Sequence, residues 1–287
     1  MNKHVLVVGG TQGIGRATAV LCAQAGATVV FTGRNNELGK QLESTNPQRL
    51  RFASFDVLDF KQIHSFTQLY QTKIDMLVLC AGGLNYGERR QTHQGLEQTF
   101  AQNVASRFYL MKKLTPLLQP HAKVINVLGG GVGGSIDMAD LQLEKNYSFM
   151  KAASQYASIT DALTMEFGKR YGHLATFFHV SPGVVNTRSV VNQHFPWFIS
   201  YPALVVLPWI ASSPESVARV FLSLLDSNQG KETFKEGYGI LGPKSFYSSF
   251  KGDQVSASKF VLDHPECPRE LFEYLEKVTE KAAATEA

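Results

Sequence analysis

Tyr147 and Lys151 are the two residues whose types and spacing point most directly to chemistry. Because they stand four positions apart where a helical apolar pattern begins, we expect the phenol and the ammonium on one face of a helix. A free tyrosine has a pKa of about 10 and is a slow acid or base at neutral pH. A neighbouring lysine cation favours the phenolate, so the pair can pass a proton to a carbonyl oxygen or take it back.

A glycine-rich turn near the N-terminus would position a partner for this chemistry. The apolar run at residues 5–8 does not alternate, which predicts a strand buried on both faces of a parallel sheet. Gly9 allows a tight turn, Gly13 lets the backbone approach a pyrophosphate, and Gly15 lets the next helix pack closely. That helix would direct its N-terminal amides at the anion. Thr11, Gln12 and Ile14 belong to the same turn, so we predict that they also contact the dinucleotide.

In the rest of the chain, apolar strands alternate with helical patterns. We expect strands at residues 5–8, 27–33, 50–55, 74–79, 122–128, 175–180 and 237–242. The expected helices lie at about 13–25, 92–118, 147–167, 214–225 and 268–281. Such alternation is typical of a parallel sheet that is covered on both faces. The sequence therefore predicts an α/β, doubly wound Rossmann fold with about seven strands, formed by residues 1–287 as a single domain.

The Gly9-xxx-Gly13-x-Gly15 spacing and the Tyr147-xxx-Lys151 pair resemble motifs of the short-chain dehydrogenase/reductase family, as does the Pro-Gly-x-Val-x-Thr run at 182–187. The resemblance covers about residues 3–187 and the helix near 214–225. It implies that Tyr147 is the acid and base of an oxidoreductase, and that Lys151 holds the nicotinamide ribose and stabilises the phenolate. The cofactor contacts that it implies are Asp56, Val57, Ala81, Gly82, Asn103, Tyr147, Lys151, Pro182, Gly183, Val185 and Thr187.

Asn103 and Asp56 each carry an alternative. The resemblance implies that Asn103 bulges its helix and helps to hold a proton-relay water near Lys151, whereas a core amide satisfied by its neighbours explains it equally well. For Asp56 the resemblance implies a contact with the adenine amino group. The alternative is a cap for the helix that begins near Asp59.

Two departures from the family pattern fall at strand ends. Where the family has Asn-Asn-Ala-Gly, this chain has Leu79 and Cys80 before Ala81-Gly82, so bracing of the central sheet must come from other side chains. Where the family has a serine that polarises the substrate carbonyl, this chain has the glycine-rich run 129–134 and then Ser135. A loop of glycines could bring Ser135 into the site. It could also leave Ser135 as an ordinary loop residue.

The residue after the second strand indicates the cofactor. In dinucleotide folds a carboxylate at this place accepts from a free ribose 2′-hydroxyl, and an arginine accommodates a 2′-phosphate. This chain has Arg34 followed by Asn35 and Asn36, with no acid. The sequence therefore favours NADP(H) over NAD(H). The alternative is that Arg34 is a solvated residue at the start of a helix.

Charge and cysteine content argue against other classes. Lys and Arg number 28 against 24 Asp and Glu, so the net charge is only +4, and without a basic stripe we expect no nucleic acid partner. Cys22, Cys80 and Cys267 lie far apart without metal-ligand spacing, so we expect no metal and a reducing compartment. Because the first strand begins near His4, we expect no signal peptide and a cytoplasmic protein.

An apolar segment at residues 188–212 follows the sixth strand and contains Trp197 and Trp209. Its prolines and polar residues argue against a membrane span. Its place in the chain predicts a lid over an apolar substrate. A homo-oligomer contact and a shallow membrane patch stay open as alternatives. Residues 243–287 form a C-terminal extension that ends in a charged, amphipathic helix.

These features together predict an NADP-dependent oxidoreductase that interconverts a carbonyl and an alcohol on a fairly apolar small molecule. The predicted catalytic residues are Tyr147, Lys151, Asn103 and Ser135. The rival prediction is a nucleotide-binding pseudoenzyme, a redox sensor or scaffold that lost turnover with its serine. Turnover of NADPH with ketones of increasing size separates the two predictions.

Overall fold

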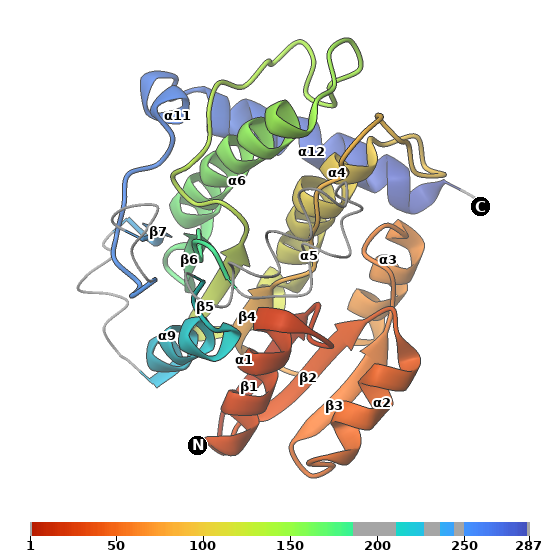
Figure 1. The fold of residues 1–287 in the computed structure, drawn as a ribbon, viewed down its shortest axis with the longest axis vertical. Coiled ribbons are helices and arrows are strands. Elements are labelled where there is room, and N and C mark those ends of the chain that lie inside the picture. The colour runs from red at the N-terminus through yellow and green to blue at the C-terminus, as the bar shows by residue number, and fades with distance from the viewer. Residues whose placement is uncertain (1, 186–210, 227–235, 244–249, 286–287) are drawn as a thin grey trace.

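The computed structural model describes residues 2–185, 211–226, 236–243 and 250–285 (Figure 1). Thr187 and most of the predicted lid therefore lie outside the described residues. So do residues 244–249 and 286–287 of the predicted C-terminal extension.

The described residues form a seven-stranded sheet whose neighbouring strands are all parallel, which confirms the predicted α/β Rossmann architecture. The strands are β1 (His4–Val8), β2 (Thr28–Gly33), β3 (Leu50–Ser54), β4 (Ile74–Leu79), β5 (Leu118–Val127), β6 (Ala175–Val180) and β7 (Tyr238–Leu241). Their order across the sheet is β3-β2-β1-β4-β5-β6-β7. The winding reverses between β1 and β4, and open α/β sheets bind ligands beyond the carboxyl ends of strands at such a point.

Helices cover both faces of this sheet (Figure 1). Successive residues of a strand point to opposite faces. In β1, Leu6 and Val8 join one core cluster and Val5 and Val7 join the other, which explains the apolar run without alternation. The first cluster includes residues of α3 (Phe60–Leu69), α5 (Ser106–Leu114), α6 (Phe149–Tyr171) and α12 (Cys267–Ala284), and the second includes residues of α1 (Gly13–Gln24), α2 (Asn36–Ser44) and α9 (Pro214–Asp226).

The helix predicted at residues 92–118 begins later and is irregular. The Thr92 amide donates to the Leu96 carbonyl, and Gly95 has a φ of +78°, so residues 92–96 form a turn. The helical elements that follow are α4 (Gln98–Phe100), a π-helical turn (Ala101–Ala105), α5 and a 3₁₀ turn (Thr115–Leu117). The first part of the prediction was wrong because apolar periodicity does not register a glycine turn closed by local hydrogen bonds.

The helix that carries Lys151 also begins later than predicted. Ser148 is the N-cap of α6, and its hydroxyl oxygen accepts from the Lys151 amide at 3.2 Å. Tyr147 therefore precedes the helix, whereas Lys151 lies in its first turn. The prediction that the phenol and the ammonium share one helical face is wrong, because a capping serine stands between them.

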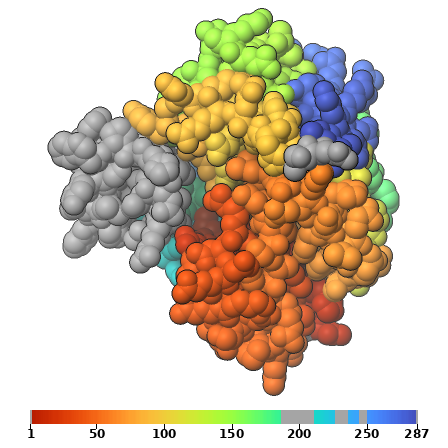
Figure 2. Space-filling model, turned by 90° about the vertical axis from the view of Figure 1, so that its right-hand side faces the viewer, coloured from red at the N-terminus to blue at the C-terminus, as the bar shows by residue number. Residues whose placement is uncertain are grey.

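The C-terminal segments pack on α5 and α6. Phe272 of α12 lies edge-on to Phe108, with ring centroids 4.9 Å apart, and its centroid is 5.2 Å from that of Phe167. Figure 2 shows the C-terminal helix, in blue, beside the yellow segments near residue 100. Before α12 come α11 (Lys259–Asp263) and an antiparallel bridge between Leu241 of β7 and Gln254. These segments join both the core and the edge of the sheet.

Candidate active site

The turn after β1 is built so that side chains are excluded from it. Gly9 and Gly13 have φ values of +86° and +56°, which side chains disfavour. A Cβ on Gly9 would lie 2.4 Å from the Ala81 nitrogen, and one on Gly15 would lie 2.1 Å from the Gly9 carbonyl oxygen. Gln12, the N-cap of α1, makes no side-chain cap. This geometry fits a pyrophosphate, because the first amides of α1 face an uncapped turn.

Arg34 lies at the carboxyl end of β2 with 66% of its side chain exposed, and its Nη1 is 3.7 Å from Asp56 Oδ2. Asp56 Oδ1 accepts from the Leu58 amide at 3.0 Å. The cap of α3 is Asp59, so the alternative role of Asp56 as that cap is wrong. Asn35 caps α2, because its side-chain oxygen accepts from the Leu38 amide.

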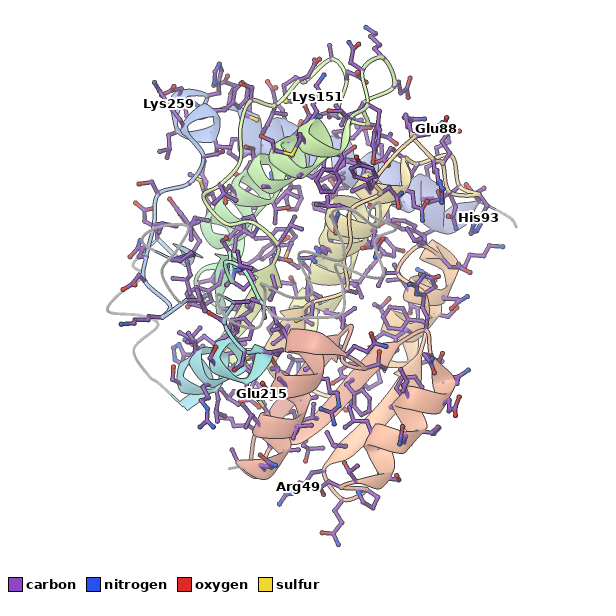
Figure 3. All side chains as sticks on the ribbon, viewed as in Figure 1. Arg49, Glu88, His93, Lys151, Glu215 and Lys259 are labelled. Carbon is purple, nitrogen blue, oxygen red and sulfur yellow. The ribbon has the colours of Figure 1, made fainter. Side chains whose placement is uncertain are left out.

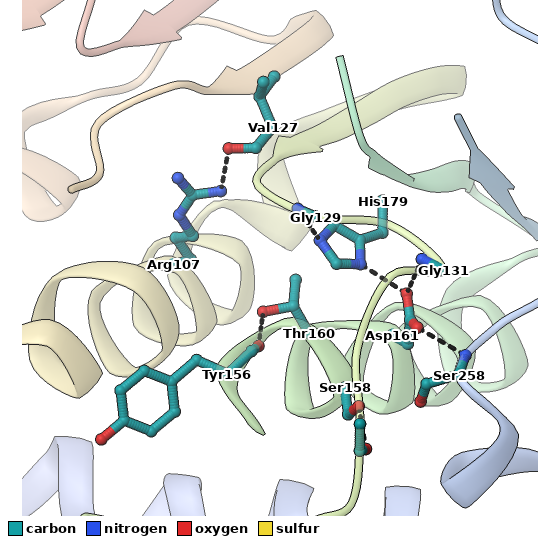
Figure 4. Close-up of polar contacts among 11 residues, drawn as sticks. Arg107, Val127, Gly129, Gly131, Tyr156, Ser158, Thr160, Asp161, His179 and Ser258 are labelled. Atoms are coloured by element: carbon teal, nitrogen blue, oxygen red, sulfur yellow. Dashed lines mark hydrogen bonds and ion pairs between the residues drawn. The ribbon is translucent and has the colours of Figure 1, made fainter. Parts of the chain in front are cut away.

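The ends of β4 and β5 are joined by a side chain that the sequence analysis missed. Arg107 of α5 is buried, and its guanidinium donates to the Ala81 carbonyl at 2.8 Å. It also donates to the Val127 carbonyl at 3.0 Å (Figure 4). Burial lowers the pKa of Arg107 to about 10, so it stays charged at neutral pH. Burial also raises the pKa of Cys80 to about 12, so this thiol stays protonated. Arg107 supplies bracing where the Asn-Asn pair is missing.

Asn103 lies in the π-helical turn, as the predicted bulge requires. Its side chain is fully buried, donates to the Gly83 carbonyl at 2.6 Å and accepts from the Gly83 amide at 3.1 Å. Both ends of the amide are thus satisfied by the turn after β4, as the core-amide alternative predicted. This contact places Asn103 beside Ala81 and Gly82, two of the predicted cofactor contacts.

The glycine-rich loop after β5 is held from behind by two buried side chains. Asp161 of α6 and His179 of β6 are both fully buried, and His179 Nδ1 is 2.7 Å from Asp161 Oδ1. The Gly129 amide donates to His179 Nε2 at 3.1 Å, so Nε2 carries no proton and Nδ1 donates to Asp161. Asp161 also accepts from the amides of Gly131 at 3.2 Å and Ser258 at 2.8 Å (Figure 4).

This loop has no space for side chains at several positions. A Cβ on Gly130 would lie 2.5 Å from the His179 carbonyl oxygen, and one on Gly133 would lie 2.6 Å from the Ser158 nitrogen. Ser135 follows on the exposed side of the loop. Within the part of the chain that the structure describes, its hydroxyl has no hydrogen-bond partner and does not contact Tyr147.

The hydroxyl of Tyr147 lies between two other segments. It donates to the Asn85 carbonyl oxygen at 3.0 Å and lies 3.3 Å from Thr99 Oγ1. The pKa of Tyr147 is raised, chiefly because burial disfavours the phenolate; the Thr99 hydrogen bond lowers it, and Glu97 raises it by charge. Lys151 stands at the start of α6 (Figure 3), and no described residue forms an ion pair or hydrogen bond with its ammonium.

The turn after β6 faces the same edge of the sheet. Gly183 has a φ of +70° after Pro182, and Val185 forms a parallel bridge with Ser212. Val57, another of the predicted cofactor contacts, is buried in the core after β3.

None of the described helices is long and apolar enough to cross a bilayer. In the same described ranges, no three His, Cys, Asp or Glu residues are grouped to bind a metal.

Comparisons with known proteins agree with this architecture. Residues 3–194 match the family model described as short chain dehydrogenase. An oxidoreductase of Emericella nidulans is 29% identical over 314 residues, which cover 98% of this chain and 94% of the relative. Human polyprenol dehydrogenase is 29% identical over 214 residues, covering 68% of this chain and 64% of that protein. Mouse retinol dehydrogenase 13 is 28% identical over 240 residues, covering 76% and 71%.

Solved structures share the fold. The crystal structure of an uncharacterized protein from Mycobacterium Paratuberculosis has a TM-score of 0.73 at 20% identity and covers 97% of this chain and 93% of its own. The structure of BdcA in complex with NADPH has a TM-score of 0.61 at 19% identity, covering 87% and 96%. Because the family model spans well over half of the sequence, the chain belongs to the short-chain dehydrogenase/reductase family.

Proposed function

We propose that this protein is an NADP(H)-dependent oxidoreductase that interconverts a carbonyl and an alcohol on a fairly apolar small molecule. The observation that carries the proposal is the turn after β1. Its glycines exclude side chains and leave the N-terminus of α1 uncapped at the carboxyl edge of a parallel sheet. Backbone amides in that position bind pyrophosphate. Membership of an oxidoreductase family supports the same activity.

Arg34 supports the choice of NADP(H). Its largely exposed guanidinium stands where a ribose 2′-phosphate would lie, and such a phosphate would form charge-assisted hydrogen bonds with it. Asp56 is 3.7 Å away and would compete for the same cation. The neighbour BdcA was solved with NADPH, which is consistent with this choice.

Tyr147 is the proton donor and acceptor in this proposal. A nicotinamide cofactor, when bound, would supply hydride to a carbonyl carbon or accept it from an alcohol carbon. In reduction, the phenol of Tyr147 gives its proton to the carbonyl oxygen, which replaces the Asn85 carbonyl as the acceptor. Lys151, as a nearby cation, favours the resulting phenolate. Asn103 holds the turn at Gly82 and Gly83 in place.

The surroundings of Tyr147 support an apolar substrate. Tyr86 follows Asn85, is 42% exposed, and its ring centroid is 5.8 Å from that of Phe149. Met150 is 71% exposed on the first turn of α6. Tyr86 thus adjoins the residue whose carbonyl accepts from the phenol, and Met150 lies three positions after Tyr147 in the chain. Relatives named polyprenol dehydrogenase and retinol dehydrogenase are consistent with a lipophilic alcohol or ketone. We infer that residues 188–212 supply a lid.

The test is turnover of NADPH with ketones and aldehydes of increasing size, in wild type and in Tyr147→Phe. The substitution keeps the ring and removes the hydroxyl, so turnover should fall at least about a hundredfold while NADPH affinity stays near normal. Tyr109→Phe is the control, because it removes a phenol hydroxyl that contacts His64 instead. Retained turnover in Tyr147→Phe would contradict the assignment.

Two observations favour the rival function, a nucleotide-binding protein without turnover. The glycine-rich run 129–134 stands in place of the family's serine, and the Tyr147 hydroxyl is engaged by the Asn85 carbonyl. A protein of this kind would bind NADPH tightly and reduce no member of the panel. Titration of NADPH by fluorescence alongside the turnover panel therefore separates the two functions.

A further inference from the structure

Thr99 stands beside Tyr147 and has no role in the family resemblance. Its side chain is almost fully buried at the start of α4, with Oγ1 3.3 Å from the Tyr147 hydroxyl oxygen. We propose that Thr99 is a positioning residue that holds the Tyr147 hydroxyl and stabilises its phenolate during proton transfer. The proposal rests on the acid and base role of Tyr147 proposed above, and its test separates the two.

The direction of the hydrogen bonds follows from a closed ring. The Asn85 amide donates to Thr99 Oγ1 at 3.5 Å, which leaves the Thr99 proton free for Tyr147. The Tyr147 hydroxyl donates its own proton to the Asn85 carbonyl at 3.0 Å. The contact between the two hydroxyls is therefore a donation from Thr99 to Tyr147. A donor of this kind strengthens when the acceptor becomes a phenolate.

The backbone of Thr99 is fixed by a buried carboxylate. Glu97 Oε1 accepts from the Thr99 amide at 2.8 Å, and Oε2 accepts from the Phe100 amide at 2.6 Å and from the Tyr156 hydroxyl at 2.9 Å. Glu97 is itself fully buried. Because Thr99 is β-branched and its backbone is tied at this cap, few rotamers are open to its hydroxyl.

The charged groups around Tyr147 do not by themselves favour a phenolate. Burial raises the pKa of Tyr147, the negative charge of Glu97 raises it further, and only Arg90 lowers it by charge. Tyr156 is neutral and donates to Glu97. Lys151 lies on the first turn of α6, and its ammonium has no partner among the described residues. The Thr99 hydrogen bond is the largest of the effects that lower the pKa of Tyr147.

Within the described ranges, no side chain of the loop after β5 reaches Tyr147 in place of Thr99. Gly129 has no side chain, and the amides of Gly129 and Gly131 are used by His179 and Asp161. Ser135 is exposed. Within the described ranges, Thr99 is the side chain whose hydroxyl reaches Tyr147.

Thr99 has the same role in carbonyl reduction and in alcohol oxidation. In reduction, the Tyr147 proton moves to the oxygen of the substrate, and Thr99 keeps donating to the phenolate left behind. In oxidation, that phenolate takes the hydroxyl proton of the alcohol, while the alcohol carbon would lose hydride to an oxidised nicotinamide. Thr99 keeps its own proton throughout, so it acts through Tyr147 and needs no contact with the substrate.

The test compares pH profiles of Thr99→Val, Thr99→Ser and wild type. Valine keeps the shape and loses the hydroxyl, so the pKa of Tyr147 should rise. Alcohol oxidation needs the phenolate, so the pH at which the oxidation rate rises should increase by about one unit. The pH at which the reduction rate falls should increase by the same amount. Thr99→Ser should restore the wild-type profile. Thr279→Val is the control, because Thr279 is equally buried and donates only to the Leu275 carbonyl.

A second readout does not depend on turnover. Phenolate absorbance is titrated in wild type, Tyr147→Phe and Thr99→Val, and the wild-type signal that Tyr147→Phe removes is assigned to Tyr147. This signal should appear at higher pH in Thr99→Val. An unchanged midpoint and an unchanged pH profile overturn the role of Thr99, even where Tyr147→Phe abolishes turnover and upholds the proposed function. Turnover retained in Tyr147→Phe overturns the proposed function instead, and the phenolate midpoint still decides the hydrogen bond.

Discussion

The turn after β1 and the loop after β5 are both rich in glycine, yet they differ in which of their backbone amides have acceptors. At the first turn, no described residue accepts from the amides of Gly13, Ile14 and Gly15. At the second, His179 and Asp161 accept from the loop amides. Glycine content alone therefore does not indicate an anion site. What decides the function of a glycine loop is whether its amides already have acceptors inside the protein.

The largest expected effect concerns the groups that hold the second loop. His179→Leu removes the acceptor of the Gly129 amide and leaves Asp161 buried without its partner. The free energy of unfolding should fall by about 3–5 kcal/mol, measured by denaturant titration. Hydrogen exchange at Gly129 and Gly131 should accelerate, while exchange at Gly13 and Gly15 stays unchanged.

The control for this experiment is Lys40→Ala, which removes a largely exposed lysine from its ion pair with Glu43 and should cost less than about 1 kcal/mol. If both loops exchanged faster in His179→Leu, the loss would be global. The two glycine loops would then not be held independently, and the contrast between them would weaken.

The next effect concerns Arg34, which follows β2 and tests the choice of nucleotide at the site that the first turn helps to form. Arg34→Ala should weaken NADPH binding by about tenfold or more, because a charge-assisted hydrogen bond to the 2′-phosphate is lost, and should leave NADH binding nearly unchanged. Fluorescence titration with both nucleotides measures the difference. Lys61→Ala on α3 serves as the control for a general loss of positive charge. Equal losses for the two nucleotides, or a wild-type preference for NADH, would contradict the choice of NADP(H).

The same comparison explains how far the sequence could be interpreted. The first turn depends on residues 9–15, which are adjacent in the chain, so spacing alone predicts its geometry. All seven predicted strands are present. The central strands could be predicted for a similar reason, because burial on both faces leaves continuous apolar runs. The second loop depends on Asp161, His179 and Ser258, which come from three separate segments. No local pattern connects them.

The contacts of the candidate catalytic site could not be predicted from the sequence for the same reason. Thr99 and Tyr147 are 48 positions apart, and Tyr147 and Asn85 are 62 apart. A sequence match predicted that Tyr147 and Lys151 act together, but the N-cap at Ser148 set their relative placement. Arg107 could have been suspected as a lone cation in the apolar stripe of α5. Its two carbonyl partners follow only from the order of β4 and β5 in the sheet.

The smallest expected effect tests whether the second loop can accommodate a serine side chain in place of one of its glycines. Gly129 opens the glycine-rich run that stands in place of the family's serine, and its φ is not in the left-handed region. A Cβ there would lie 3.1 Å from Val132 Cγ2 and 3.3 Å from Ala157 Cβ, so small shifts of flexible neighbours would accommodate it. Gly129→Ser should therefore fold, keep its amide bond to His179, and raise the rate of carbonyl reduction severalfold by adding a hydroxyl donor.

Gly130→Ser is the matched control for Gly129→Ser. Its Cβ would lie 2.5 Å from the His179 carbonyl oxygen, which is backbone and cannot move aside, so this variant should lose stability and gain no rate. The comparison is made by thermal unfolding and by initial rates at saturating NADPH. A Gly129→Ser protein that folds normally and turns over at the wild-type rate would mean that a donor at this position adds nothing to proton transfer. Proton transfer would then depend on Tyr147 alone, with Thr99 holding its hydroxyl, and the amides of the second loop would serve only to hold the loop against β6.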